Sequence, residues 1–297
     1  MDNSSKIRLW KVLSWNVRGL NSEKKWDAIR DKIVESGCDI VCLQETKRET
    51  FDLQFLRKFC PRSFDAFEFL PSVGASGGVI TIWKSHLFYG SLIFSNDYGI
   101  SVEFTSKHNA IEWVLTNIYA PCTSAGKVHF LNWFKEIHMP PEILWMILGD
   151  FNLLRSPEVR NCPDGDVNEM LHFNESISAL DLIEIPLKGK RFTWSNKQHP
   201  PLLERLDWFF TSSSWTSIFP STSASTLNME TSDHVPWLVF IATDIPKGAV
   251  FIFENYLMEH ENFLEVVHHR WSIPTHQTDM AKRLTAKFKN LRRVIKS

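Results

Sequence analysis

The sequence predicts an α/β protein in which strands and helices alternate along the chain. Short apolar runs of strand length alternate with amphipathic stretches whose apolar residues recur at helical spacing. Polar and glycine-containing breaks separate the two kinds of segment, as at Arg18-Gly19-Leu20-Asn21-Ser22. The composition is that of a folded chain, since 43% of the 297 residues are hydrophobic, 23% are charged and the formal net charge is −1.

The first elements are a strand, a helix and a second strand. Leu9–Trp15 and Asp39–Gln44 are apolar runs of strand length, and the second is expected to be buried. Lys24–Ser36 is predicted to be a helix that ends at Gly37. The apolar residues at helical spacing in this helix are Trp26, Ile29, Ile33 and Val34.

The same pattern continues as far as residue 241. The expected strands are Gly78–Trp83, Ile111–Tyr119, Leu144–Leu148, Arg191–Trp194, Arg205–Phe210 and Val235–Ile241. The expected helices are Asn168–Leu180 and Gly126–Ile137, the latter with Val128, Phe130, Leu131 and Phe134 facing inward. The chain shows no internal repeat.

A change in composition divides the chain near Asp244–Gly248. We expect one domain over residues 1–245 and a helical basic tail over 246–297. The tail holds nine Lys or Arg against five Asp or Glu, a net charge of +4, so the preceding domain carries −5. The basic helix expected at Ala281–Ser297 either contacts phosphates or is a solvated face.

Cysteine usage and hydropathy limit the cellular setting. The five cysteines are odd in number and irregularly spaced, which argues against a disulfide framework and a zinc module. The N-terminus lacks the apolar core of a signal peptide. No run approaches the roughly 18 apolar residues of a membrane helix. We therefore expect a nuclear or cytoplasmic protein without a membrane segment.

Polar side chains recur where the predicted strands end or begin. Each has a structural alternative: Asn16 can cap a turn, Glu45 can face a helix dipole and Asp150 can hold a Gly-Asp turn. The set as a whole predicts a site, because ligand sites in α/β folds gather at strand ends. Its members are Asn16, Glu45, Tyr119, Asp150, Asn152, Asp207, Asp233 and His234.

These residue types suit metal-assisted chemistry on a phosphate. The oxygen ligands of Asn16, Glu45 and Asp233 favour Mg2+, or Mn2+, over zinc. A carboxylate beside the ion can deprotonate water, and a histidine held by a carboxylate can stabilise charge on a phosphoryl oxygen. P-loop, GxSxG and HExxH motifs are absent from the sequence.

The ordered motifs resemble a known family. They are WNVRGLN (15–21), LQET (43–46), GGV (77–79), NIYAP (117–121), GDFN (149–152), RLDWFF (205–210) and SDH (232–234). As a set they resemble the endonuclease/exonuclease/phosphatase superfamily, and within it the apurinic-like endonuclease of plant LINE-type non-LTR retrotransposons. Phe192-Thr193-Trp194 and the segment Phe253–Trp271 also resemble that subgroup. The resemblance implies a DNase I-like four-layer sandwich of two mixed β-sheets flanked by helices.

The resemblance also implies roles for individual residues. The metal would be held by Glu45 and Asn16, with Asp233 supporting the metal or the histidine. Asp150 would be the general base, Asn152 its partner at the phosphate, and Tyr119 a contact to the phosphate. His234 would contact the scissile phosphate and be oriented by Asp207. Secondary substrate contacts would be Thr193, Ser232 and Cys122.

The implied partner is duplex DNA, bound through its backbone, with no membrane and no obligate protein partner. The tail resembles the linker that precedes a reverse transcriptase, and no polymerase YxDD motif is present. The sequence therefore resembles a detached or truncated piece of an element.

One position departs from the family pattern. Where the family often has Asn after the Y-x-P step, this chain has Cys122, and a thiol is a poorer donor than an amide. Losing one donor to a developing charge costs on the order of a hundredfold in rate, unless the variation is tolerated.

Two further features have alternative interpretations. The aromatic residues Phe192, Trp194, Trp208 and Trp215 either stack on bases or pack in the core. The basic segment Lys188–Arg191 either contacts phosphates or forms an ordinary hairpin turn.

Three functions stay open at this point. The first is a Mg2+-dependent DNA-nicking endonuclease. The second keeps the fold and acts on a phosphoinositide, sphingomyelin or RNA. The third is a non-catalytic relic that binds nucleic acid.

Overall fold

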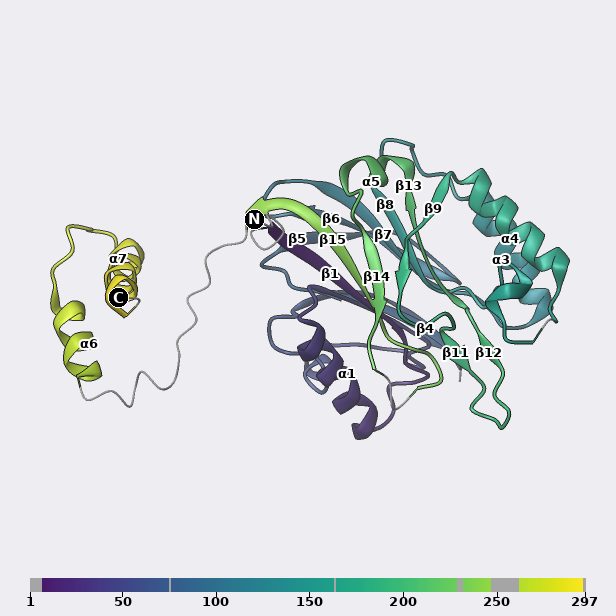
Figure 1. Cartoon of the computed structure of the whole chain (residues 1–297), viewed down its shortest axis with the longest axis horizontal. Helices are drawn as coiled ribbons and strands as arrows, with labels where there is room; N and C mark the ends of the chain where they lie inside the picture. Colours follow the sequence, from purple (N-terminus) through teal and green to yellow (C-terminus); the bar gives the residue numbers. More distant parts are fainter. Residues whose placement is uncertain (1–6, 75, 163, 229–231, 247–261, 296–297) are drawn as a thin grey trace. The chain divides into compact units, whose positions relative to one another are not determined.

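The structure, a computed structural model, describes residues 7–74, 76–162, 164–228, 232–246 and 262–295 (Figure 1). The chain divides into two compact units, Met1–Pro246 and Lys247–Ser297. Within the described part of the first unit, two large mixed β-sheets pack face to face with helices on their outer faces. The four-layer sandwich expected from the sequence is therefore confirmed.

The first large sheet, called sheet A, is built around β1 and β2. In spatial order it runs β10 (Leu187–Lys188), β14 (Ser223–Thr226), β15 (Trp237–Pro246), β1 (Ile7–Asn16), β2 (Ile40–Gln44), β4 (Ser76–Trp83) and β3 (Ala66–Val73). β1 is parallel to β2 and antiparallel to β15. The C-terminal ends of β1 and β2 and the start of β15 therefore meet at one edge of the sheet.

The second large sheet, called sheet B, is built around β7 and β8. In spatial order it runs β5 (Phe88–Asn96), β6 (Gly99–Ser106), β7 (Glu112–Tyr119), β8 (Trp145–Asp150), β13 (Asp207–Ser212) and β9 (Leu182–Glu184). β7 is parallel to β8, and β13 is antiparallel to β8. A separate hairpin pairs β11 (Trp194–Ser195) with β12 (Leu203–Glu204).

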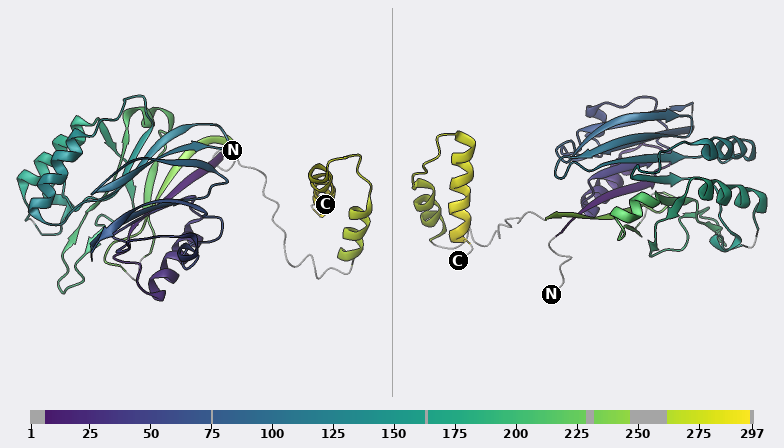
Figure 2. Two further views of the ribbon diagram at one scale, coloured as in Figure 1. Left: turned by 180° about the vertical axis from the view of Figure 1, so that it is seen from behind. Right: turned by 90° about the horizontal axis from the view of Figure 1, so that it is seen from above.

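The helices cover the outer faces of the sheets (Figures 1 and 2). The helix α1 (Glu23–Ser36) and the short α2 (Leu53–Leu56) cover sheet A, and α3 (Ser124–Glu136) and α4 (Val167–Ala179) cover sheet B. A 3-10 turn, η2 (Pro157–Val159), precedes α4, and α5 (Ser213–Ile218) follows β13. The second unit contains α6 (Phe263–Ser272) and α7 (Met280–Ile295).

Local signals in the sequence set the helix ends. Gly37 adopts the left-handed conformation, with φ 57°, and its N–H bonds the carbonyls of Ile33 and Val34, which confirms the predicted end of α1. Thr123 caps α3 and Asp166 caps α4 through side-chain oxygens that accept backbone N–H bonds.

Apolar layers on both sides of each sheet hold the sandwich together. Trp10, Trp113 and Trp237 are fully buried between the two sheets. On the outer faces, Ile29 of α1 packs on sheet A, and Phe130 of α3 packs on sheet B. This three-part core holds much of the aromatic content of the chain, because the layer between the sheets and the layer under α3 and α4 are rich in Trp and Phe.

Several expectations about elements are wrong. Val128, expected to face inward, is 55% exposed. The expected strand Arg191–Trp194 is replaced by the two-residue β11. The elements not predicted are β3, β5, β6, β9, β10, β12, β14, α2 and α5. Most of these strands are short or lie at sheet edges, where polar residues weaken the alternation that marks a half-buried strand.

The tail helix predicted over Ala281–Ser297 is present as α7. Residues 247–261, which include the start of the aromatic segment Phe253–Trp271, and residues 296–297 lie outside the described residues. Across the described part of the chain, no helix has both the length and the apolar character needed to cross a membrane.

Candidate active site

The strands that face the space between the sheets change from apolar to polar toward one end. In β1, the inward side chains Trp10 and Val12 are followed by Ser14 and then Asn16. In β8, the inward residues Met146 and Leu148 are followed by Asp150, and in β7 Trp113 and Leu115 are followed by Asn117 and Tyr119. This follows from period-two alternation, because residues i, i+2 and i+4 share one face. The polar ends of both sheets therefore meet at one edge of the sandwich.

The register of sheet B aligns three of the predicted residues. Asp150 is the Cα partner of Tyr119 on β7 and of Asp207 on β13. Close approach of β7 and β8 requires glycine just before Asp150, because a Cβ on Gly149 would lie 2.0 Å from the carbonyl oxygen of Ile118. The row Tyr119–Asp150–Asp207 is thus set by strand pairing.

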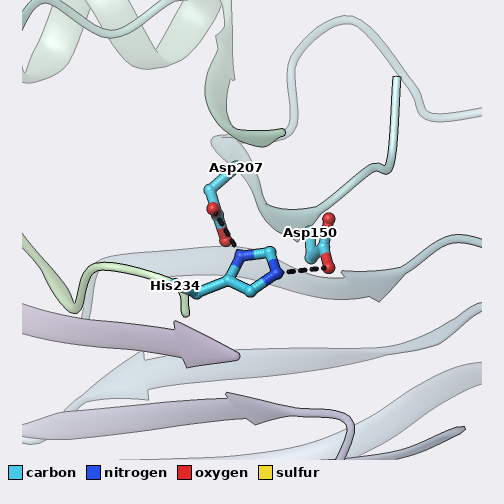
Figure 3. A group of neighbouring side chains, drawn as sticks. All are labelled: Asp150, Asp207 and His234. Carbon is cyan, nitrogen blue, oxygen red and sulfur yellow. Dashed lines mark hydrogen bonds and ion pairs between the residues drawn. The ribbon is translucent and has the colours of Figure 1, made fainter. Parts of the chain in front are cut away.

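His234 lies between two of these carboxylates (Figure 3). Its Nδ1 is 2.9 Å from Oδ2 of Asp207, and its Nε2 is 3.6 Å from Oδ2 of Asp150. All three side chains are buried. Their ligand-capable atoms lie within 4.8 Å of one another, which is compact enough for one cation.

Burial and mutual charge shift the pKa values of this group. Burial and the neighbouring Asp207 raise the pKa of Asp150 to about 7, against the opposing effect of His234. For His234, burial alone would lower the pKa, but Asp207 and Asp150 outweigh it and raise the pKa to about 9. At neutral pH, His234 is therefore protonated while Asp150 is close to its midpoint.

Asn16 joins this group to Glu45. Its Nδ2 donates to Oδ2 of Asp150 at 2.8 Å and to Oε2 of Glu45 at 3.3 Å. Glu45 follows β2 with a φ of 51°, and its Oε1 pairs with Lys47 at 3.0 Å. The Asn16 amide thus links a residue of sheet A to a residue of sheet B.

Asn152 and Tyr119 flank Asp150. The backbone N–H of Asn152 donates to Oδ1 of Asp150 at 3.0 Å, and its side-chain amide donates to the carbonyl of Ala120 at 2.8 Å. Burial, together with the carboxylates of Glu45 and Asp150, raises the pKa of Tyr119, so its phenol stays protonated. Both residues are half-buried and border the group from the side of sheet B.

Two predicted residues, Thr193 and Ser232, support this site from behind. The buried hydroxyl of Thr193 accepts the N–H of Asp207 at 3.0 Å, which fixes the start of β13. The hydroxyl of Ser232 donates to the carbonyl of Asn16 at 3.0 Å and accepts the N–H of His234 at 3.2 Å. Thr193 and Ser232 therefore hold catalytic candidates in place.

Asp233 bonds to a different set of residues from Glu45. Its Oδ2 accepts the indole N–H of Trp194 at 3.0 Å and pairs with the guanidinium of Arg18. Burial would raise the pKa of Asp233, but His234, Trp194 and Arg18 outweigh it and lower the pKa. Asp233 is therefore ionised and already paired with a cation.

Cys122 is exposed and lines a pocket beside the group. The pocket has a volume of about 330 Å3, and Asn152, Trp194 and Leu206 share its lining. An exposed thiol thus lines the same pocket as Asn152.

Base stacking is excluded for two of the proposed aromatic residues. Trp208 and Trp215 are 1% and 0% exposed and belong to the core. Trp194 is half-buried and donates its indole N–H to Asp233, and Phe192 is also half-buried. In the basic segment, Lys188 forms part of β10 and Arg191 bonds the carbonyl of Glu158, so the segment is tied to the fold.

Sequence reasoning missed three polar residues at this end of the molecule. Arg18 was assigned only to a chain break, although it stands in the same motif as Asn16. Gln44 and Asn117 form a buried amide pair between the sheets, 2.6 Å apart, directly beneath the site. Their inward position in strands β2 and β7 was the available signal, since a polar residue at a core position needs a partner.

The residues around Glu45 fit a hard divalent cation. Glu45 is the half-buried carboxylate of the set. A second oxygen donor is Oδ1 of Asn16, which belongs to the same side-chain amide whose Nδ2 contacts Glu45. Mg2+ commonly takes one or two carboxylates and completes its shell with water and substrate phosphate. The Asp150–Asp207–His234 group is less suited, because His234 is protonated at neutral pH and imidazole favours softer metals.

The structure is an α/β sandwich of two mixed sheets with a buried carboxylate–histidine–carboxylate group at one end of the strands, and these features define its class. The chain belongs to the endonuclease/exonuclease/phosphatase family, whose sequence profile matches residues 13–234.

Solved structures share this fold at low sequence identity. The AP endonuclease LMAP from Leishmania major superposes with a TM-score of 0.62 at 16% identity, over 81% of this chain and 89% of that one. The endonuclease domain of TRAS1, a telomere-specific non-LTR retrotransposon, gives 0.60 at 14% identity, over 79% and 98%. An AP endonuclease from Archaeoglobus fulgidus gives 0.59 at 17% identity, over 78% and 99%. None of the curated proteins matches the sequence.

Proposed function

We propose that this protein is a Mg2+-dependent phosphodiesterase that nicks duplex DNA. The observation that carries the proposal is the convergence of Asn16, Asp150 and His234, from distant parts of the sequence, on one edge of the sandwich. Family membership supports phosphodiester hydrolysis. The structural neighbours named as endonucleases support a nucleic acid substrate.

Asp150 acts as the general base. Its pKa of about 7 lets it take a proton from water near neutral pH. The N–H groups of Asn16 and Asn152 hold the carboxylate in one orientation, so the proton goes to a fixed oxygen. The deprotonated water attacks phosphorus in line with the leaving oxygen.

His234 stabilises the charge that grows on the phosphoryl oxygens. With a pKa of about 9 it is protonated at neutral pH, and Asp207 fixes its ring through Nδ1. The Nε2–H is then the donor available to the phosphate. Tyr119, whose phenol stays protonated, is a second donor at the same end of sheet B.

Glu45 and Asn16 are the residues that would hold the metal. When bound there, Mg2+ would neutralise charge on the scissile phosphate. Mn2+ has the same ligand preferences and is expected to substitute.

We further propose an origin in a LINE-type retrotransposon of plants. The motif set and the retrotransposon endonuclease among the structural neighbours support it. In this proposal residues 1–245 form the endonuclease domain, residues 246–297 correspond to a linker before a reverse transcriptase, and the site of action is nuclear.

Nicking of supercoiled plasmid tests the proposal. The wild type should convert plasmid to open circles with Mg2+ and not with EDTA, and Glu45→Ala and His234→Ala should each lose at least about a hundredfold in rate. The matched controls are Glu35→Ala and His172→Ala, which change exposed residues of α1 and α4. Undiminished nicking by either site variant contradicts the proposal.

The same preparation distinguishes the alternative functions. Hydrolysis of poly(A), phosphoinositide or sphingomyelin without plasmid nicking assigns the site to another phosphodiester. Binding of DNA without any cleavage identifies a non-catalytic relic, and a Cys122→Asn variant that then gains nicking locates the defect at that position.

A further inference from the structure

The ion pair between Arg18 and Asp233 is strongly asymmetric. The Arg18 side chain is 57% exposed, whereas the Asp233 side chain is 5% exposed. Among the described residues, Asp233 is the acceptor of the guanidinium, and the exposed side chain leaves further N–H donors accessible. A buried anion thus holds an arginine that still has donors to offer a ligand.

The backbone that carries Arg18 is fixed on both sides. Its N–H donates to Oδ1 of Asn16 at 3.0 Å, and the next residue, Gly19, donates to the carbonyl of Glu45 at 2.7 Å. Arg18 itself has a φ of 54°, a left-handed conformation that is strained for a non-glycine residue. Such strain persists where the surrounding structure enforces it, and here the enforcing contacts come from the candidate metal ligands.

The carboxylate of Asp233 has little room for a metal ion. Its Oδ2 takes the indole N–H of Trp194 as well as Arg18, and its Oδ1 lies 3.3 Å from the hydroxyl oxygen of Ser232. An ionised carboxylate offers about four acceptor positions, and Arg18 and Trp194 fill the two on Oδ2. Arg18 therefore supplies at Asp233 the positive charge that a cation would otherwise supply.

Further cations lie on the same side of the site. The ammonium of Lys25 donates to the carbonyl of Val17, next to Arg18. Lys197 is exposed in the hairpin whose Ser195 N–H donates to the carbonyl of Asp233 at 3.1 Å. The domain has net negative charge, so this local group of cations is the feature that suits a polyanion.

We propose that Arg18 binds a backbone phosphate of the nucleic acid substrate, and that Asp233 anchors this guanidinium and is not a metal ligand. The inference deepens the proposed function and rests on it for the identity of the substrate. Arginine suits this position because its planar fork can hold a carboxylate on one edge and a phosphate on another.

Binding of DNA without metal tests the first half. A fluorescein-labelled duplex is titrated with protein in EDTA between 50 and 200 mM KCl by fluorescence anisotropy. Arg18→Met should weaken binding and reduce the slope of log Kd against log salt by about 0.9, the change expected for one lost phosphate contact. Arg18→Lys should retain most of the slope, and thermal unfolding verifies that each variant is folded.

The matched control is Arg30→Met. Arg30 forms an arginine–aspartate pair with Asp27 on α1, where no site residue lies. An unchanged slope in this variant supports the proposal. An unchanged slope in Arg18→Met, or an equal loss in Arg30→Met, overturns it. The binding experiment does not depend on nicking. If Arg18→Met reduces the salt slope of a protein that cuts no plasmid, the proposed function is refuted and the phosphate contact by Arg18 is retained.

Binding of Mn2+ alone, followed by electron paramagnetic resonance, tests the second half. Asp233→Asn should change the Mn2+ Kd by less than about twofold, whereas Glu45→Gln should weaken it by at least about tenfold. An Asp233→Asn loss as large as that of Glu45→Gln overturns the assignment of Asp233 to Arg18.

Discussion

Asp150 and Asp207 are register partners on the antiparallel strands β8 and β13, and the ring of His234 lies between their carboxylates (Figure 3). Like charges on neighbouring strands repel, so the protonated imidazole stabilises their placement. The same ring connects sheet A to sheet B. His234 lies in the segment just before β15 of sheet A, whereas both aspartates belong to sheet B.

The rate of nicking should depend on pH as a bell. Asp150 must be deprotonated to act as base, so the rate rises through its pKa of about 7. His234 must be protonated to act as donor, so the rate falls through its pKa of about 9. A maximum near about pH 8 in single-turnover rates of the metal-loaded protein would agree, and a rate that is flat from pH 6 to 10 would refute these roles.

Asp207→Asn should shift the alkaline side of that profile. The amide keeps the shape of the side chain but removes the charge that raises the pKa of His234. We expect the rate to fall by at least about a hundredfold at pH 8 and its alkaline midpoint to move to lower pH. Duplex binding in EDTA should change little, which separates this loss from a loss of affinity.

The stability of the fold should decrease as these groups lose their protons. Folding raises the pKa of Asp150 from 3.8 to about 7, so its contribution is complete below pH 3.8 and is lost as pH rises through about 7. The Asp150→Asn variant has no ionisable side chain at this position. Urea unfolding from pH 4 to 8 should therefore show the wild type losing free energy of unfolding relative to the variant. Parallel curves would contradict the raised pKa.

The buried amide pair Gln44–Asn117 should show strong energetic coupling. Gln44 donates to Oδ1 of Asn117 at 2.6 Å, and Asn117 donates to the carbonyl of Ile80 at 3.1 Å. Replacing either amide by leucine leaves a buried partner unsatisfied and should cost about 1–3 kcal/mol. The double variant should lose less than the sum by about 0.5 kcal/mol or more. Strict additivity in urea unfolding would show that the two amides act independently.

Trp208 and Trp194 should separate a structural role in the core from a role in duplex binding. Trp208 is 1% exposed and donates to the carbonyl of Leu153, so Trp208→Phe should lower the free energy of unfolding by about 1–3 kcal/mol. Trp194 binds Asp233 and is half-buried, so Trp194→Phe should be less destabilising and should affect duplex binding through Asp233 and Arg18. Equal thermal shifts for the two variants would contradict this division.

The sequence by itself determined the α/β class, the helices α1, α3 and α4, and the polar residues at the ends of β1, β2, β7 and β8. These properties are local, because periodicity, capping residues and strand-end polarity are set by neighbours in the chain. The motif set also located the family, which the match over residues 13–234 confirms.

Only the tertiary structure decided which of those residues bond to one another. That Asn16 bonds Asp150, that His234 bonds Asp207 and that Asp233 belongs to Arg18 depend on strand register and on packing between sheets. Edge strands such as β3 and β5 were likewise hidden, since neighbouring strands hold them in place more than their own patterns do. Asn16 and Asp150, like Arg18 and Asp233, are more than a hundred positions apart in the sequence, and local patterns carry no record of such pairings.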